Sequence, residues 1–171
     1  MFNEIIEKVL EKEGLFSDNK HDKGGKTKYG ITENIARNYG YKGEMQKLPL
    51  ETAKDIYKRM YWKKEFEQFD QTIAEFLFDC HVNHGYKGMS LILQRAINLN
   101  TRNNVVVDGY AGKNTYSAAT KIDPKRLYVA LNAQRCSYYI SICNNDETQE
   151  TFIYGWLKNR IDWKKVGEYI G

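Results

Sequence analysis

The residues best suited to chemistry lie early in the chain. Glu13 continues an apolar stripe that repeats with helical spacing from Phe2 onward. The C-terminal end of a helix and burial both disfavour a negative charge, so both favour the protonated form that a general acid requires. Asp22 follows in a glycine-rich segment, where the backbone can turn closely beside a ligand. Such a pair can cleave a glycosidic bond: one carboxyl group protonates the leaving oxygen, and the other supports the oxocarbenium-like transition state, positions water or attacks the sugar.

The same residues also have ordinary structural explanations. A single Glu at a helix end is more often solvated or ion-paired, and an Asp before Lys-Gly-Gly is more often a turn residue. His21, beside Asp22, is in a loop where histidines are usually solvated. His81 and His84 have no third ligand at the spacing of a zinc site, so we predict no metal. Residue type and spacing alone therefore leave both interpretations open.

The elements that must position these residues are predicted to be mainly helical. Apolar periodicity and capping signals predict helices over residues 2–13, 32–40, 49–64, 73–82 and 124–143, one that starts at 89, and a last one around Trp156. Segment 73–82 is apolar nearly all round, which is typical of a central buried helix. Residues 15–31 are polar and glycine-rich, so we expect a loop or short hairpin. Residues 105–107 are expected to be extended before a turn.

Composition narrows the class of protein. With 171 residues, of which 42% are hydrophobic, the chain has room for one domain, or one domain with a second lobe. Residues 1–88 carry 15 basic and 15 acidic side chains, whereas residues 89–171 carry 11 and 7, so the net charge of +4 comes from the second half. This excess suits a polyanionic cell-wall polymer and is too weak for a committed nucleic-acid binder.

Cysteine content and the N-terminal segment bear on localisation. Three cysteines make no disulfide scaffold, which favours synthesis in a reducing cytoplasm. The first residues lack the features of a signal peptide, and no apolar run reaches the ~18 residues of a membrane span. We therefore expect a protein made in the cytoplasm, with no stable membrane insertion and no signal peptide.

Several motifs, in order, resemble those of glycoside hydrolase family 108. Glu13-Gly14 and then Asp22-Lys-Gly-Gly-Lys-Thr-Lys-Tyr-Gly-Ile-Thr32 are similar to the family's Glu-Gly-Gly-Tyr and Asp-Pro-Gly-Gly-x-Thr-Asn-Tyr/Phe-Gly-Ile-Thr. Segments 56–62 and 78–85 resemble its Tyr-x-x-x-Tyr-Trp and Phe-Asp-x-x-Val-Asn-x-Gly blocks. Segments 93–96, 107–115 and 155–160 resemble the peptidoglycan-binding domain that usually follows. Four residues depart from the signature, namely Leu15, Phe16, Lys23 and Lys28.

The resemblance implies a peptidoglycan muramidase of the phage endolysin type, which hydrolyses the β-1,4 bond between N-acetylmuramic acid and N-acetylglucosamine. The implied general acid is Glu13. The order Glu, Asp, Thr also resembles that of phage-type lysozymes, in which case Asp22 and Thr27 would assist, with Thr27 holding a water. Tyr29 and Trp62 are expected to stack on sugar rings.

Three further residues have alternative interpretations. Asn83, which lies one turn after Asp79 on the same predicted helix, is expected to bind substrate at the floor of the cleft, with capping of local backbone as the alternative. Tyr57 and Tyr61 lie at helical spacing and are expected to belong to the core, with stacking on a sugar ring as the alternative for Tyr61.

We therefore predict a mainly α, lysozyme-like α+β fold. Residues 1–88 are expected to form a helical catalytic lobe with a short loop or hairpin, and residues 89–171 a helical peptidoglycan-binding lobe. The expected protein is a monomer that acts on peptidoglycan glycan strands without metal or organic cofactor, after reaching the wall through a holin-type lesion or an export system. Two alternatives stay open: a lytic transglycosylase that cuts the same bond, and a non-catalytic wall-binding or secretion-associated protein.

Overall fold

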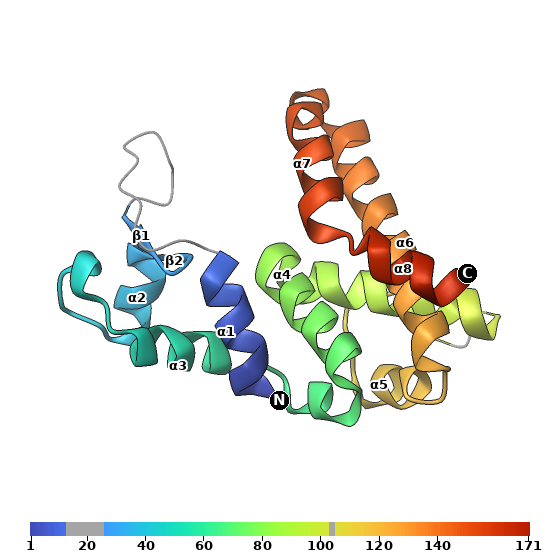
Figure 1. Cartoon of the computed structure of the whole chain (residues 1–171), viewed down its shortest axis with the longest axis horizontal. Helices are drawn as coiled ribbons and strands as arrows, with labels where there is room; N and C mark the ends of the chain where they lie inside the picture. Colours follow the sequence, from blue (N-terminus) through green and yellow to red (C-terminus); the bar gives the residue numbers. More distant parts are fainter. Residues whose placement is uncertain (13–25, 103–104) are drawn as a thin grey trace. The chain divides into compact units, whose positions relative to one another are not determined.

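The computed structural model describes residues 1–12, 26–102 and 105–171. These residues form eight α-helices and one small antiparallel sheet of two strands (Figure 1), which confirms the mainly α, lysozyme-like fold. They divide into two compact units, Met1–Lys63 and Lys64–Gly171, called unit 1 and unit 2 below. The division after Lys63 is one of packing and lies within the segment expected to form the catalytic lobe. The boundary expected between the two functional lobes, at residue 88, stays a prediction.

Unit 1 is built from three helices and the sheet. Its elements are α1 (Phe2–Lys12), β1 (Thr27–Lys28), β2 (Ile31–Thr32), α2 (Glu33–Tyr39), a short 3-10 turn (Met45–Lys47) and α3 (Leu50–Tyr61). The apolar stripe of α1 faces the core, since Ile5 and Ile6 are completely buried, and α1 packs against α3. All three predicted helices are present, and Thr32 and Gly40 cap α2 as expected.

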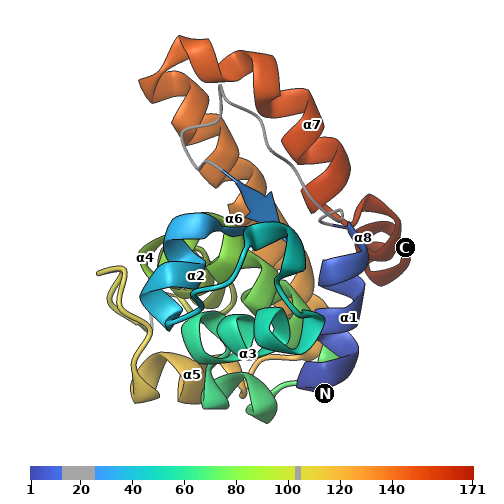
Figure 2. The same ribbon diagram turned by 90° about the vertical axis from the view of Figure 1, so that its left-hand side faces the viewer.

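The two strands form a hairpin with a tight turn. Thr27 pairs with Thr32 and Lys28 with Ile31, and the turn residues Tyr29 and Gly30 have φ values of 53° and 74°. Positive φ at both central residues matches the right-handed twist of a short hairpin. Figures 1 and 2 show this hairpin and the C-terminal end of α1 on the same side of α3.

Unit 2 is entirely helical in its described part. It contains a 3-10 turn (Lys64–Gln68), α4 (Gln71–Thr101), α5 (Lys113–Ala119), α6 (Pro124–Asn145), a 3-10 turn (Glu147–Gln149), α7 (Glu150–Arg160) and α8 (Trp163–Ile170). The central helix α4 packs mainly against α6, and its side chains from Ile73 to Ile97 supply much of the core. The buried central helix expected over residues 73–82 is therefore confirmed.

The structure bears out the break expected between the helix over 73–82 and the helix that starts at 89. Both are parts of α4, which is interrupted at Gly85, whose φ of 67° and ψ of 175° are not helical. Helices α5 and α8 were not predicted. Helix α5 has only seven residues, whereas α8 carries Trp163, Val166 and Ile170 at helical spacing, a signal that the sequence analysis did not use. The extended piece at 105–107 is not a strand, because no described segment pairs with it; Val106 is 76% exposed.

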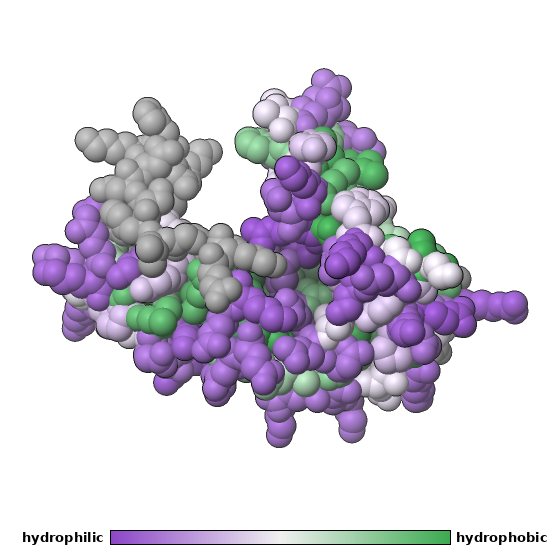
Figure 3. All heavy atoms as spheres, in the orientation of Figure 1, coloured by the Kyte–Doolittle hydropathy of each residue, from purple (hydrophilic) through white to green (hydrophobic). Residues whose placement is uncertain are grey.

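Helices α6 and α7 lie side by side in Figures 1 and 2 and are joined by stacked rings. The ring of Trp156 on α7 stacks on Tyr139 of α6, with centroids 5.1 Å apart, and on Phe152 at 6.0 Å. Hydrophobic residues also reach the surface of this helix pair (green in Figure 3), where Ile140 and Phe152 are about half exposed. The stack holds α7 against α6 and so sets the position of Arg160 at the end of α7.

Within the described residues, no helix has the length and hydropathy needed to span a membrane.

Candidate functional site

The two predicted catalytic carboxylates, Glu13 and Asp22, lie outside the described residues. Helix α1 ends at Lys12, one position before Glu13 in the sequence, and β1 begins at Thr27, five positions after Asp22. Of the other predicted site residues, Thr27, Tyr29 and Trp62 belong to unit 1, and Asn83 belongs to unit 2.

The hairpin is anchored to the rest of unit 1 by hydrogen bonds. The hydroxyl group of the buried Tyr57 donates to the main-chain oxygen of Tyr29 at 3.0 Å, and Lys28 Nζ donates to the main-chain oxygen of Gln46 at 2.6 Å. The core position expected for Tyr57 is confirmed. The half-buried Thr27 is thus held by a hairpin whose next two residues, Lys28 and Tyr29, are anchored.

Tyr29 has an unusual backbone conformation. Its φ of 53° lies in the left-handed region, which is uncommon for a residue with a bulky side chain. The half-buried ring also carries the Lys28 ammonium group 5.1 Å from its centroid. Residues held in sparsely populated conformations concentrate at functional sites, which keeps Tyr29 a candidate for contact with substrate.

Trp62 is the C-cap residue of α3, near the end of unit 1. Its ring is half-buried and makes an edge contact with Phe2, with centroids 5.2 Å apart. This contact joins the end of α3 to the start of α1, so Trp62 has a packing role whether or not it also stacks on a sugar. Tyr61, also expected in the core, is half-buried rather than fully buried.

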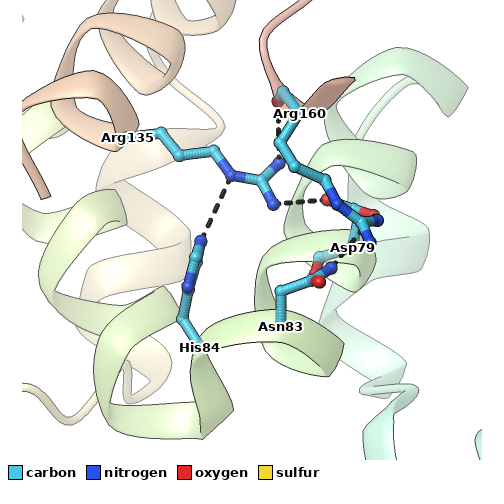
Figure 4. Close-up of polar contacts among 5 residues, drawn as sticks. All are labelled: Asp79, Asn83, His84, Arg135 and Arg160. Carbon is cyan, nitrogen blue, oxygen red and sulfur yellow. Dashed lines mark hydrogen bonds and ion pairs between the residues drawn. The ribbon is translucent and has the colours of Figure 1, made fainter. Parts of the chain in front are cut away.

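In unit 2, Asn83 and Asp79 belong to a polar cluster that joins three helices (Figure 4). The exposed Asn83 donates from Nδ2 to the main-chain oxygen of Asp79 at 2.7 Å and to its carboxylate Oδ1 at 3.2 Å. The Asp79 carboxylate pairs with Arg135 of α6, with 2.5 Å between Oδ2 and Nη2, and with Arg160 of α7, with 3.2 Å between Oδ1 and Nη1. Asn83 therefore orients the carboxylate that ties α4 to α6 and α7.

Arg135 is the centre of this cluster and is only 2% exposed. Its Nε donates to His84 Nε2 at 3.2 Å, and its Nη1 donates to the main-chain oxygen of Arg160 at 3.2 Å (Figure 4). The rings of Phe76 and Tyr139 lie 5.4 and 5.8 Å from the guanidinium carbon. A buried guanidinium needs a paired charge and acceptors for its N–H groups. Here Nε and Nη1 donate hydrogen bonds, whereas Nη2 makes the ion pair with Asp79 without the geometry of a hydrogen bond.

His84 is held in its neutral form by this environment. Burial is the main cause that lowers the pKa of His84 to about 4, and the positive charge of Arg135 contributes more to this shift than the Asp79 carboxylate opposes it. The neutral ring suits the geometry, because His84 Nε2 accepts the hydrogen bond from Arg135 and a protonated nitrogen has no lone pair for it.

The depressed pKa of His84 predicts a loss of stability in acid. An unfolded His binds its proton near pH 6.5, whereas the folded one binds it only near pH 4, so between these values the unfolded state holds more protons. The contribution of His84 to the free energy of unfolding is complete above pH 6.5 and is lost as the pH falls to 4. At 1.36 kcal/mol per pKa unit, this loss is roughly 3 kcal/mol.

Denaturant unfolding at pH 7.5 and 4.5 measures this loss. The His84→Gln variant is the control, because its amide oxygen still accepts from Arg135 and does not titrate. We expect the variant to lose less stability than the wild type between the two pH values. Equal losses in both proteins would show that other groups account for the acid sensitivity.

Sequence reasoning missed Arg135, although its signal is present. Five buried residues of α6 follow each other at four-residue spacing, and Arg135 is the charged member: Leu127, Leu131, Arg135, Tyr139 and Cys143. A charged side chain on an apolar helical stripe is the same signal that singled out Glu13.

As for metals, the described residues contain no group of three or more His, Cys, Asp or Glu side chains placed to hold an ion.

Two protein-family models match the chain, and their matches cover the segments described above. Residues 6–85 match the model described as "Glycosyl hydrolase 108", and residues 89–161 match the one described as "Predicted Peptidoglycan domain". The protein is a glycoside hydrolase of the lysozyme type. Residues 6–85 thus form a glycosyl hydrolase 108 domain, and a C-terminal peptidoglycan-binding domain follows it.

A search of solved structures shows the same fold in a bacterial protein. The structure titled "Structure of Brucella abortus SagA" aligns with a TM-score of 0.75 over 99% of this chain and 93% of that chain, at 24% sequence identity. At this identity the likeness concerns the fold alone. A comparison with curated proteins finds no match.

Proposed function

We propose that this protein is an N-acetylmuramidase that hydrolyses the β-1,4 bond between N-acetylmuramic acid and N-acetylglucosamine in peptidoglycan. The observation that carries the proposal is the glycosyl hydrolase 108 match over residues 6–85, which contains every residue assigned to the site. A peptidoglycan-binding domain in the same chain supports peptidoglycan as the polymer that is cut.

In this proposal, Glu13 donates a proton to the glycosidic oxygen as the bond to the sugar breaks. Asp22 stabilises the positive charge that develops on the sugar ring, or activates the attacking water. Thr27 helps to hold that water, and its support is the anchored hairpin, which fixes the strand that carries Thr27. The chemistry needs neither a metal nor an organic cofactor, because two carboxyl groups supply both proton transfer and charge stabilisation.

Three residues are proposed to bind the glycan. Tyr29 and Trp62 each have a half-buried ring in unit 1, and a partly exposed aromatic face suits the flat C–H face of a sugar. Asn83 is exposed on α4, and its amide oxygen stays available as an acceptor while Nδ2 donates to Asp79.

Mass spectrometry of the fragments released from purified sacculi tests the bond and the reaction. We expect muropeptides that end in reducing N-acetylmuramic acid. Fragments with 1,6-anhydro ends would instead identify a lytic transglycosylase, and reducing N-acetylglucosamine ends would identify cleavage of the other glycan bond. A pure, folded sample that binds sacculi and releases nothing would identify a non-catalytic wall-binding protein.

Action at the cell wall follows from the peptidoglycan-binding domain. We propose that the protein works there as a monomer and reaches the wall through a holin-type lesion or an export system. Sedimentation of the purified chain at several concentrations tests the monomer, with a mass near 20.0 kDa as the expected result.

A further inference from the structure

A polar pocket in unit 2 has features of a ligand site that the proposed catalytic chemistry does not use. It has a volume of about 420 Å³ and lies between α4, the segment that starts at Val105 and the start of α5. This volume falls in the range of roughly 300–1,000 Å³ that is typical of small-ligand sites. The residues that line it include Gln94, Val106, Asp108, Lys113, Asn114 and Thr115.

The wall of the pocket is held in shape by Gln94, which is only 1% exposed. Its Nε2 donates to Asp108 Oδ1 at 2.7 Å and to the main-chain oxygen of Tyr110 at 3.0 Å, while its Oε1 accepts from Gly109 N at 2.9 Å. Asp108 Oδ1 also accepts from Tyr110 N at 2.8 Å. The side chain of one buried residue thus fixes three consecutive residues of the loop, so the pocket is preformed.

Two opposite charges line this pocket without neutralising each other. Within the part of the chain that the structure describes, neither Lys113 nor Asp108 makes an ion pair with any residue. The hydrogen bonds from Gln94 and from Tyr110 N–H lower the pKa of Asp108, so this carboxylate is ionised at neutral pH. The exposed Lys113 carries its positive charge on the same pocket wall.

Uncharged groups of the pocket add hydrogen-bonding and apolar surface. Thr115 is 6% exposed, and its hydroxyl group forms no hydrogen bond with another described residue. The hydroxyl oxygen is not among the buried atoms that lack a partner, so it is open to solvent and can form a hydrogen bond with a bound ligand. The exposed Asn114 offers an amide, and Val106 offers an apolar side chain that is 76% exposed.

We propose that this pocket binds the stem peptide of peptidoglycan, with Lys113 pairing with a peptide carboxylate and Asp108 with a free amine. A short peptide with carboxylates, an amine, backbone amides and alanine methyl groups matches every lining group named above. A neutral N-acetylated glycan would leave both pocket charges unpaired, which is why the peptide is the better ligand. This inference rests on the proposed function, because it takes peptidoglycan as the polymer that the protein binds.

Binding of a soluble stem tripeptide, L-Ala-γ-D-Glu-diaminopimelate, to the full chain tests the proposal. Titration calorimetry measures its Kd, and a neutral tetramer of N-acetylglucosamine serves as the competing ligand. We expect Lys113→Glu to weaken tripeptide binding by about tenfold or more, since it replaces an attractive charge by a repulsive one. The Lys113→Glu variant should remain folded, because a carboxylate in the first turn of α5 is favourable there.

The Lys121→Glu variant is the matched control. It makes the same change in net charge on an exposed side chain that does not line the pocket, and we expect its Kd for the tripeptide to equal that of the wild type. Equal weakening by both substitutions would overturn the proposal, since the effect would then be one of net charge. Absence of tripeptide binding, or displacement of the tripeptide by the glycan tetramer, would overturn it too.

Release of muropeptides from sacculi by the same samples separates this proposal from the proposed function. A protein that cuts sacculi but binds no tripeptide retains its muramidase assignment and loses the stem-peptide site. A protein that binds the tripeptide with the expected dependence on Lys113 but cuts nothing retains the site and loses the muramidase assignment.

Discussion

The Glu13→Gln variant is expected to stay folded and to cleave peptidoglycan slower by orders of magnitude. Gln matches Glu in size and shape but has no proton to donate to the leaving oxygen, and general acid catalysis is typically worth ~10²–10⁴-fold. Turbidity clearing of sacculi and counts of released reducing ends measure the rate, and circular dichroism checks the fold. A folded variant that clears sacculi at nearly the wild-type rate would exclude Glu13 as the acid.

The Asp22→Asn variant is the companion test, and we expect it to lower the maximal rate by no more than Glu13→Gln does. Asn can cap a turn as Asp does but cannot stabilise a cation or activate water as a carboxylate can. A lower rate with an unchanged melting temperature supports a chemical role. Full activity would leave Glu13 as the only required carboxylate and would favour the transglycosylase alternative, in which no water attacks.

The second large effect concerns stability. We expect Asp79→Asn to lower the free energy of unfolding by about 3 kcal/mol, because removing one partner of a buried ion pair leaves the other charge uncompensated. Arg135 is 2% exposed and has Asp79 as its closest anionic partner, at 2.5 Å, whereas the carboxylate itself is 24% exposed. Denaturant unfolding measures the change.

The Asp123→Asn variant is the matched control for this measurement. Asp123 Oδ1 caps α6 by accepting from Arg126 N at 3.0 Å, and Asn caps a helix about as well as Asp. The same chemical change at this exposed position should leave the free energy of unfolding almost unchanged. Arg160→Ala should also cost less than Asp79→Asn, since Arg160 is 28% exposed. An Asp79→Asn variant as stable as the Asp123→Asn variant would refute the structural role of the cluster.

Local pattern was enough to predict the parts of this protein that depend on neighbours in the chain. The apolar stripe of residues 2–10 gave α1, and Thr32 and Gly40 gave both caps of α2, because helix periodicity and capping act within a few residues. The order of the motifs around Glu13 and Asp22 pointed to the glycosyl hydrolase 108 family, which the match over residues 6–85 bears out.

Tertiary structure alone decided which distant residues meet. Nothing near Asp79 in the sequence indicates Arg135 and Arg160 as its partners, because these pairings depend on how α4, α6 and α7 pack. The irregular course of 105–107 depended likewise on the tertiary structure, because no strand in the described chain pairs with this segment. Hydrogen bonds and ion pairs form between groups that packing brings within about 3 Å, and spacing along the chain does not encode that proximity.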